Sequence, residues 1–179
     1  IEDLAFNAAG HYAVRAIDNV GNFGALSPSP RFAVDTVTMV AENGANTMTG
    51  VTATAPWGLE DGYDGQAFSI SPGDNYASNL DAHLTLSNLP GGNNAVTIVF
   101  RTRFQIETGY DFGFAEVSHD GGGSWEQLDV FTGERDWHRR RYEVVTSGPI
   151  TLRFRFTSDR SVTKEDWLID EIQIFTPDP

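Results

Sequence analysis

Short stretches of strict two-residue alternation, separated by clusters of Gly, Asn, Asp and Pro, most restrict how this chain can fold. The clearest lies in residues 149–157, where Ile150, Leu152, Phe154 and Phe156 alternate with polar residues. Such alternation is typical of a strand with one buried face, and helical periodicity is absent from nearly all of the chain. Similar windows predict strands at residues 12–17, 31–36, 50–54, 67–70, 83–86, 96–103, 112–117, 126–130, 141–145 and 167–175.

This series of short strands predicts an all-β fold, an antiparallel β-sandwich of the jelly-roll type. Hydrophobic residues make up 40% of the 179 residues, which is enough for one sizeable core. No apolar run approaches the length of a membrane helix, so we expect no membrane insertion.

Charge and cysteine content exclude several functions. The chain has 12 basic and 25 acidic residues, a net charge of -13, which repels phosphate backbones and predicts no nucleic-acid partner. It has no cysteine, which excludes disulfides, thiolate metal sites and a Cys nucleophile. An acidic, glycine-rich, cysteine-free chain is compatible with bound Ca²⁺ as a structural staple.

The first residues differ from the rest. The sequence GHYAVRAIDNVGN at residues 10–22, followed by SPSP at 27–30, resembles the last two strands of a fibronectin type III domain. We therefore expect a fibronectin-like hairpin or partial domain at residues 1–35, a junction at 35–40, and a jelly-roll domain at 36–179. The start, Ile1-Glu2-Asp3, lacks a basic or apolar leader, so we expect the chain to be a segment of a longer protein.

Residues 118–125, SHDGGGSW, match the Asp-box pattern S-x-D-x-G-x-[ST]-W. We expect Asp120 to accept hydrogen bonds from the backbone of its own turn, and the glycines to adopt positive φ. Trp125 is expected to fill the core beneath the turn. The motif therefore predicts a rigid turn rather than a reactive site.

Three further segments, FQIETGYDFGFAEVS (104–118), LRFRFTSD (152–159) and WLIDEI (167–172), extend the similarity. With the Asp-box and GDNYASNLDAHLTL (73–86), they resemble the MAM-like or carbohydrate-binding-module-like jelly-roll domain of immune inhibitor A-type and related secreted bacterial peptidases. The resemblance covers about residues 38–175. The chain departs from it at Glu171, where the family has a second Asp, and at Ile70, where the family has Asp.

The resemblance implies a structural Ca²⁺ held between the first and last strands. Glu42 and Asp170 are the ligands it implies, with Asp74 and Asp81 as further candidates. The alternative is that these acids are solvated or form Asx turns, and the two departures would weaken or remove a site that uses them. Asn75 is a further candidate beside Asp74 and Asp81, and Glu60, Asp61 and Asp64 are weaker candidates still.

Catalytic motifs are absent from the sequence: there is no H-E-x-x-H, no G-x-S-x-G and no phosphate-binding glycine loop. The four histidines lack metal-ligand spacing. Glu107 and Asp111 could flank a glycosidic bond, but a structural hydrogen-bonding role for Glu107 is favoured. We therefore predict no catalytic residue and no enzymatic activity.

Aromatic and basic residues offer the remaining candidates for binding. The run RDWHRRR at residues 135–141 is interpreted as a loop and strand start with a core tryptophan, and docking of an acidic partner is the alternative. An exposed platform formed by Trp57, Tyr63, Tyr76 or Trp137 would favour sugar binding. The candidate ligand-binding residues are Trp57, Tyr63 and Trp137.

The resemblance implies a non-catalytic accessory domain of a secreted bacterial multidomain hydrolase, with a peptidase as the favoured parent. Its expected partners are other domains of the parent and a protein substrate or polysaccharide, and its expected location is extracellular. The alternative is a carbohydrate-binding module of an extracellular glycoside hydrolase or adhesin, because a fold does not fix a function.

Overall fold

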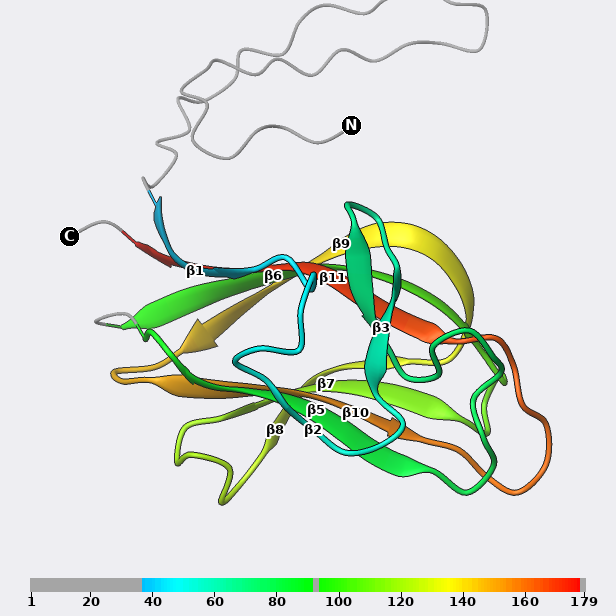
Figure 1. Ribbon diagram of the computed structural model, residues 1–179. Helices are drawn as coiled ribbons and strands as arrows, with labels where there is room; N and C mark the ends of the chain where they lie inside the picture. Colours follow the sequence, from blue (N-terminus) through cyan, green and yellow to red (C-terminus); the bar gives the residue numbers. More distant parts are fainter. Residues whose placement is uncertain (1–36, 92–93, 178–179) are drawn as a thin grey trace, which may run out of the picture. The chain divides into compact units, whose positions relative to one another are not determined.

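The computed structural model describes residues 37–91 and 94–177, which form two β-sheets packed face to face (Figure 1). No helix occurs in this part of the chain, and the predicted all-β jelly-roll sandwich is confirmed. Residues Thr38–Thr176 form one compact unit. The fibronectin-like hairpin predicted at residues 1–35, with its two strands, lies outside the described residues.

Each sheet brings together strands that are distant in sequence. The six-stranded sheet has the order β3 (Gly58–Asp61), β4 (Gln66–Ser69), β11 (Trp167–Pro177), β6 (Ala95–Ile106), β9 (Gly133–Val145), and β1 (Val37–Asn43) also pairs with β11. The five-stranded sheet has the order β2 (Thr52–Ala53), β5 (Asp81–Leu89), β10 (Ile150–Thr157), β7 (Phe112–Ser118), β8 (Glu126–Phe131). Non-consecutive neighbours in both sheets reflect connections that cross between the layers.

The structure adds two strands that the alternation does not predict and corrects the interpretation of the basic run. The added strands are β1, which starts at Val37, and β3. The basic run at residues 135–141 lies inside the 13-residue strand β9 and is not a loop. Strand β9 pairs with β6 along nearly its whole length, and the register shifts between Arg135 and His138.

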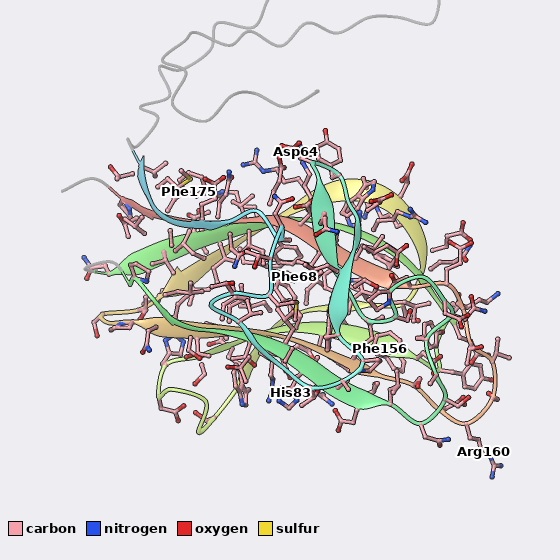
Figure 2. All side chains as sticks on the ribbon, viewed as in Figure 1. Asp64, Phe68, His83, Phe156, Arg160 and Phe175 are labelled. Atoms are coloured by element: carbon pink, nitrogen blue, oxygen red, sulfur yellow. The ribbon has the colours of Figure 1, made fainter. Side chains whose placement is uncertain are left out.

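The core lies between the sheets, and alternation in β10 builds much of it. Ile150, Leu152, Phe154 and Phe156 are all at most 1% exposed, as their period of two predicts. Figure 2 shows Phe68, from the opposite sheet, and Phe156 among the side chains between the two layers. Removing these side chains from water supplies the main free energy that holds the sheets together.

Trp167 is the largest fully buried side chain and joins the two layers. Its ring contacts Phe131, Phe154 and Phe156 at centroid distances of 5.4, 5.9 and 6.4 Å. A Cβ at Gly113 would lie 2.8 Å from this ring, so only glycine leaves room for the tryptophan.

The segment that matches the Asp-box pattern, residues 118–125, forms the β7–β8 turn with the predicted local bonding. Asp120 Oδ1 accepts from Ser124 N at 2.9 Å, and Gly121 and Gly122 have φ of 74° and 104°. Hydrogen bonds from Ser124 and Ser118 hold the pKa of Asp120 below its usual range. The prediction that Trp125 fills the core is wrong.

Trp125 instead lies on the outer side of the five-stranded sheet. It is only partly buried, and the Arg153 guanidinium is 3.8 Å from the centroid of its ring. Arg153 in turn binds Glu116 with an Nε to Oε2 distance of 2.7 Å. The motif thus adds a surface cation–π pair to the sheet rather than a core side chain.

A buried carboxyl group, Asp166, joins the end of β4 to the start of β11. Its Oδ2 accepts from Ser69 Oγ at 2.5 Å, and its Oδ1 accepts from the backbone amides of Ile70 and Trp167 at 3.1 and 2.6 Å. Burial, with a contribution from the charge of Glu60, raises the pKa of Asp166 to about 7. A carboxyl that is buried beside another acid holds its proton more tightly than one in water.

We expect the domain to gain stability when the pH falls from 8 to 5. The folded-state pKa of Asp166, about 7, lies above the ordinary value of 3.8 for an aspartate, so the folded chain binds the extra proton in this window. This proton should raise the free energy of unfolding by about 2 kcal/mol. Urea unfolding at pH 5, 6.5 and 8 measures how the free energy of unfolding changes with pH.

Asp166→Asn is the control, because it cannot titrate. The difference in pH dependence between wild type and variant gives the contribution of Asp166 alone. His138 contributes with the opposite sign, because burial lowers its pKa. The same pH slope in both proteins would contradict the assignment.

Candidate functional site

The outer face of the six-stranded sheet carries a cluster of two aromatic rings and an arginine. Tyr63, in the turn between β3 and β4, is 49% exposed, and its ring lies 5.9 Å from Trp137 of β9 at an interplanar angle of 66°. The Arg101 Cζ of β6 lies 4.0 Å from the Tyr63 ring centroid. We call Tyr63, Trp137 and Arg101 the aromatic–arginine cluster.

Strand alternation places the cluster on the outer face. In β6, Phe100 and Phe104 point into the core, so Arg101 between them points outward. In β9, His138 contacts Phe104 on the inner side, so its neighbour Trp137 points the opposite way. The turn that carries Tyr63 projects beyond the sheet, as the position of Asp64 at its tip shows (Figure 2).

Asp170 of β11 holds the turn that carries Tyr63. Its fully buried carboxylate accepts from the backbone amides of Tyr63 and Asp64 through Oδ2, at 2.9 and 3.0 Å. The Oδ1 atom accepts from Glu171 N at 2.7 Å. Asp170, which the resemblance implies as a calcium ligand, thus accepts hydrogen bonds from three backbone amides. Two of these bonds attach the β3–β4 turn to β11.

A β-bulge in β11 positions Arg101. The register between β11 and β6 shifts between Asp170 and Gln173, and Glu171 adopts a φ of 46° in the left-handed region. The Glu171 carboxylate then accepts from Arg101 Nε at 2.5 Å. Arg101 is held between this carboxylate and the Tyr63 ring, so the cluster is organised before any ligand arrives.

A separate surface hollow of about 350 Å³ lies at the start of β9, and no residue of the aromatic–arginine cluster lines it. Both signs of charge line it, and Arg103 and Glu165 form an ion pair at 3.3 Å. The lining residues are Arg103, Phe104, Gln105, Glu134, Arg135, Asp136 and Glu165. Mixed donors and acceptors suit a polar, uncharged or zwitterionic ligand better than a polyanion.

Two of the four predicted aromatic candidates are buried. Trp57 is 7% exposed and packs edge-on against Trp167, and Tyr76 is 1% exposed and packs against Phe156. Because they belong to the core, they cannot form a sugar platform, and the prediction for Trp57 as a ligand-binding residue is wrong. The interpretation of Trp137 as a core side chain is also wrong, since it pairs with Tyr63 on the surface.

The predicted metal ligands each have a partner of their own within the protein. Glu42 accepts from Gln173 Nε2 at 3.1 Å, Asp74 accepts from Asn75 N at 2.8 Å, and Asp81 lies 3.6 Å from Arg155. None of these three, nor Asp170, belongs to a group of three acidic or histidine ligands within residues 37–91 and 94–177. Calcium binding at these positions stays a prediction.

Glu107 and Asp111, the acidic pair noted in the sequence, lie at one end of the sandwich in the loop between β6 and β7. Asp111 is fully buried and accepts from the Tyr76 hydroxyl and from Asp159 N, each at 2.7 Å. The hydrogen-bonding role predicted for the Glu107 carboxylate is wrong for its Oε2 atom, which is buried without a partner.

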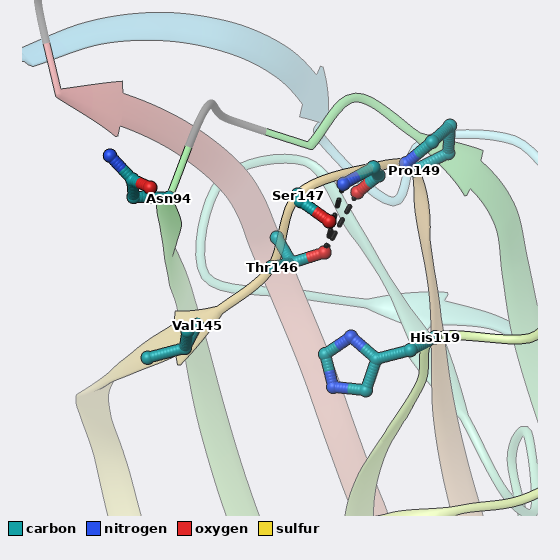
Figure 3. Close-up of a pocket in the computed structure, with 7 residues that line it drawn as sticks. Asn94, His119, Val145, Thr146, Ser147 and Pro149 are labelled. Carbon is teal, nitrogen blue, oxygen red and sulfur yellow. Dashed lines mark hydrogen bonds between the residues drawn. The ribbon is translucent and has the colours of Figure 1, made fainter.

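A second hollow, of about 420 Å³, lies beside His119 and the turn that joins β9 to β10 (Figure 3). Its polar groups bond mainly within that turn, where Thr146 Oγ1 donates to Gly148 O at 2.9 Å. His119 faces Glu126 at 3.6 Å across exposed surface. The hollow therefore gathers no set of groups that could transfer a proton or bind a metal.

Comparison by sequence gives one distant relative. Over 102 residues, 55% of this chain, the sequence is 26% identical to Bacillopeptidase F of Bacillus subtilis (strain 168). The match spans 7% of that protein's length. No protein-family model matches the chain. In the described residues no helix is long and apolar enough to cross a membrane.

Comparison by structure supports the jelly-roll fold. The CBM22-1 xylan-binding domain of Paenibacillus barcinonensis Xyn10C has a TM-score of 0.55 and 17% identity, and the match covers 82% of this chain and all of that one. The K1 cleaved adhesin domain of Lys-gingipain from Porphyromonas gingivalis W83 has a TM-score of 0.54 and 12% identity, covering 80% and 99%. A family 16 carbohydrate-binding module gives 0.51 and 16%, covering 76% and 99%. These identities show the fold alone.

Arg101 and Asp170 could not have been assigned their roles from the sequence. The β6 alternation indicates that Arg101 points away from the core, but its contact with Tyr63 depends on the pairing of β11 with both β4 and β6. The sequence does indicate that Asp170 has hydrogen-bond donors, since an acid inside an apolar strand needs them. It does not indicate which groups donate, because two of them are backbone amides more than 100 residues away.

Proposed function

We propose that residues 37–177 form a non-catalytic accessory module of a larger secreted hydrolase, with a peptidase as the parent, and that the module binds its target through the aromatic–arginine cluster. The observation that carries this proposal is the pre-organised, solvent-facing contact of Tyr63, Trp137 and Arg101. Tyr, Trp and Arg are the residue types most enriched at the energetic centres of protein interfaces.

The buried acids support a non-catalytic role. Asp111, Asp166 and Asp170 each accept hydrogen bonds from backbone amides or hydroxyls, and Glu116 binds Arg153. A general acid or nucleophile needs instead a side chain that faces a substrate cavity beside a proton acceptor. The similarity to Bacillopeptidase F and the fold shared with an adhesin domain of Lys-gingipain favour a peptidase parent.

A carbohydrate-binding module is the second candidate, and the Tyr63–Trp137 pair on the outer face of the sheet favours it. Sugar rings stack on flat aromatic faces, and solved structures with this fold include a xylan-binding domain. Two features argue for a protein target instead. The two rings meet at 66° and offer no single flat platform, and the Arg101 guanidinium covers one face of Tyr63.

Retention of the full chain on immobilised ligands separates the two candidates. We expect it to bind denatured casein, to pass through xylan and β-glucan matrices, and to hydrolyse none of them. Binding to a polysaccharide without binding to casein would favour the second candidate and contradict the first. Reproducible release of peptide or sugar by the purified chain would contradict a non-catalytic module.

A further inference from the structure

The basic residues of this acidic chain gather on two adjacent strands. The net charge is -13, yet β6 and β9 hold six of the 12 basic residues. These two strands pair with each other along most of their length within the six-stranded sheet. Half of the chain's basic residues therefore lie on one pair of strands. They are Arg101, Arg103, Arg135, Arg139, Arg140 and Arg141.

The pairing register places three of these arginines on the outer face of the sheet. Arg139 lies directly opposite Arg101, and opposed residues of an antiparallel pair point to the same side, so both point outward. Arg141 follows two positions later in β9 and shares this side by strand alternation, while Tyr142 stacks on the core residue Phe100 on the other side. We call Arg101, Arg139 and Arg141 the arginine row.

The arginine row continues the aromatic–arginine cluster. Arg101 belongs to both, because its guanidinium lies 4.0 Å from the Tyr63 ring centroid. Trp137 lies two positions before Arg139 on β9 and packs against the same Tyr63 ring. The two aromatic side chains and the row of positive charges therefore share one side of the sheet.

The charges of the arginine row leave room for a negative partner. Like charges directly opposite each other, as in Arg101 and Arg139, are unfavourable in a sheet, and a carboxylate from outside would relieve that repulsion. The Arg141–Glu143 ion pair at 2.9 Å joins side chains that are 50% and 69% exposed. Exposed pairs of this kind contribute little to stability, so a carboxylate of a partner can replace Glu143 at little cost.

We propose that the target segment bound at this site is an acidic peptide, whose carboxylates bind the arginine row while its apolar side chains contact Tyr63 and Trp137. This inference rests on the proposed function, because it names the chemistry of the target at the same site. Arginine binds carboxylates through two parallel hydrogen bonds. The net charge of -13 repels a long polyanion, so a short acidic segment fits better than an anionic polysaccharide.

Neutralising the carboxylates of a bound protein tests this inference. Binding of the full chain is measured to dephosphorylated, denatured casein and to the same casein with its carboxyl groups converted to neutral amides. Dephosphorylation removes phosphate as an alternative anion. Amidation should raise the Kd at least about 10-fold, and about 0.5 M NaCl should weaken binding of the unmodified casein far more than binding of the amidated casein.

Two double variants show whether the effect comes from the arginine row. Arg139→Gln/Arg141→Gln should lose about 10-fold in affinity for the unmodified casein and match wild type on the amidated casein, a pattern that misfolding would not produce. Arg160→Gln/Lys164→Gln is the matched control, because it removes the same charge from exposed residues of the β10–β11 loop, and it should bind like wild type.

The possible results separate this inference from the proposed function. Equal wild-type affinity for the two caseins would overturn the acidic target and leave the proposed function intact. Binding of neither casein would contradict the proposed function and the acidic target together. An equal loss in the two double variants, or tighter binding to polygalacturonate than to casein, would also overturn the acidic peptide target.

Discussion

Replacing Asp170 by alanine should lower the free energy of unfolding by about 3 kcal/mol and weaken target binding at the same time. The fully buried carboxylate accepts from the amides of Tyr63, Asp64 and Glu171, and alanine leaves all three without an acceptor. Charge-assisted bonds of this kind are stronger than neutral ones. The turn that carries Tyr63 would lose its attachment to β11.

Urea unfolding measures the stability change, and Asp64→Ala is the matched control. Asp64 lies in the same turn with an exposed side chain, so its truncation should change stability by no more than about 0.5 kcal/mol. If Asp170→Ala and Asp64→Ala unfold at the same urea concentration, the three amide bonds do not hold the turn.

The second large effect is expected at the centre of the core. Trp167→Ala should lower the free energy of unfolding by about 5 kcal/mol, because a fully buried ring that contacts Phe131, Phe154 and Phe156 leaves a large cavity. The indole Nε1 also donates to Thr102 Oγ1 at 2.9 Å, and this buried hydroxyl would lose its donor.

Trp125→Ala is the control for side-chain size. The same truncation on the outer sheet surface removes a contact with Arg153 but opens no cavity, so its cost should be about 1 kcal/mol. Chemical unfolding of both variants compares them directly. Equal losses would contradict the assignment of Trp167 to the core and Trp125 to the surface.

Much of the fold could be predicted from alternation, and the failures have local causes. Strand β10 was predicted because it buries Ile150, Leu152, Phe154 and Phe156 on one face. Strands β1 and β3 consist of partly buried and exposed residues that do not alternate with a period of two, so nothing in their sequence distinguished them from loops. Strand β9 was predicted only in part. The charged residues in its first half face solvent, although the backbone there still pairs with β6.

The candidate site was predictable only in its separate components. Tyr63 and Trp137 were candidates because exposed aromatics suggest binding, but Trp57 had the same signal and is buried. The role of Arg101 arises from strand order, which one sequence does not reveal.

Binding by the double variant Tyr63→Ala/Trp137→Ala tests the central claim most directly. Tyr63 is exposed and Trp137 is partly buried on the outer face of the sheet, so the variant should stay folded and lose only part of its stability. Its equilibrium dissociation constant for denatured casein should rise at least about 100-fold, as expected for the loss of two interface anchors of about 2 kcal/mol each with partial coupling. Tyr110→Ala, at a tyrosine that is 67% exposed outside the cluster, should bind like wild type. Wild-type affinity in the double variant would contradict the account.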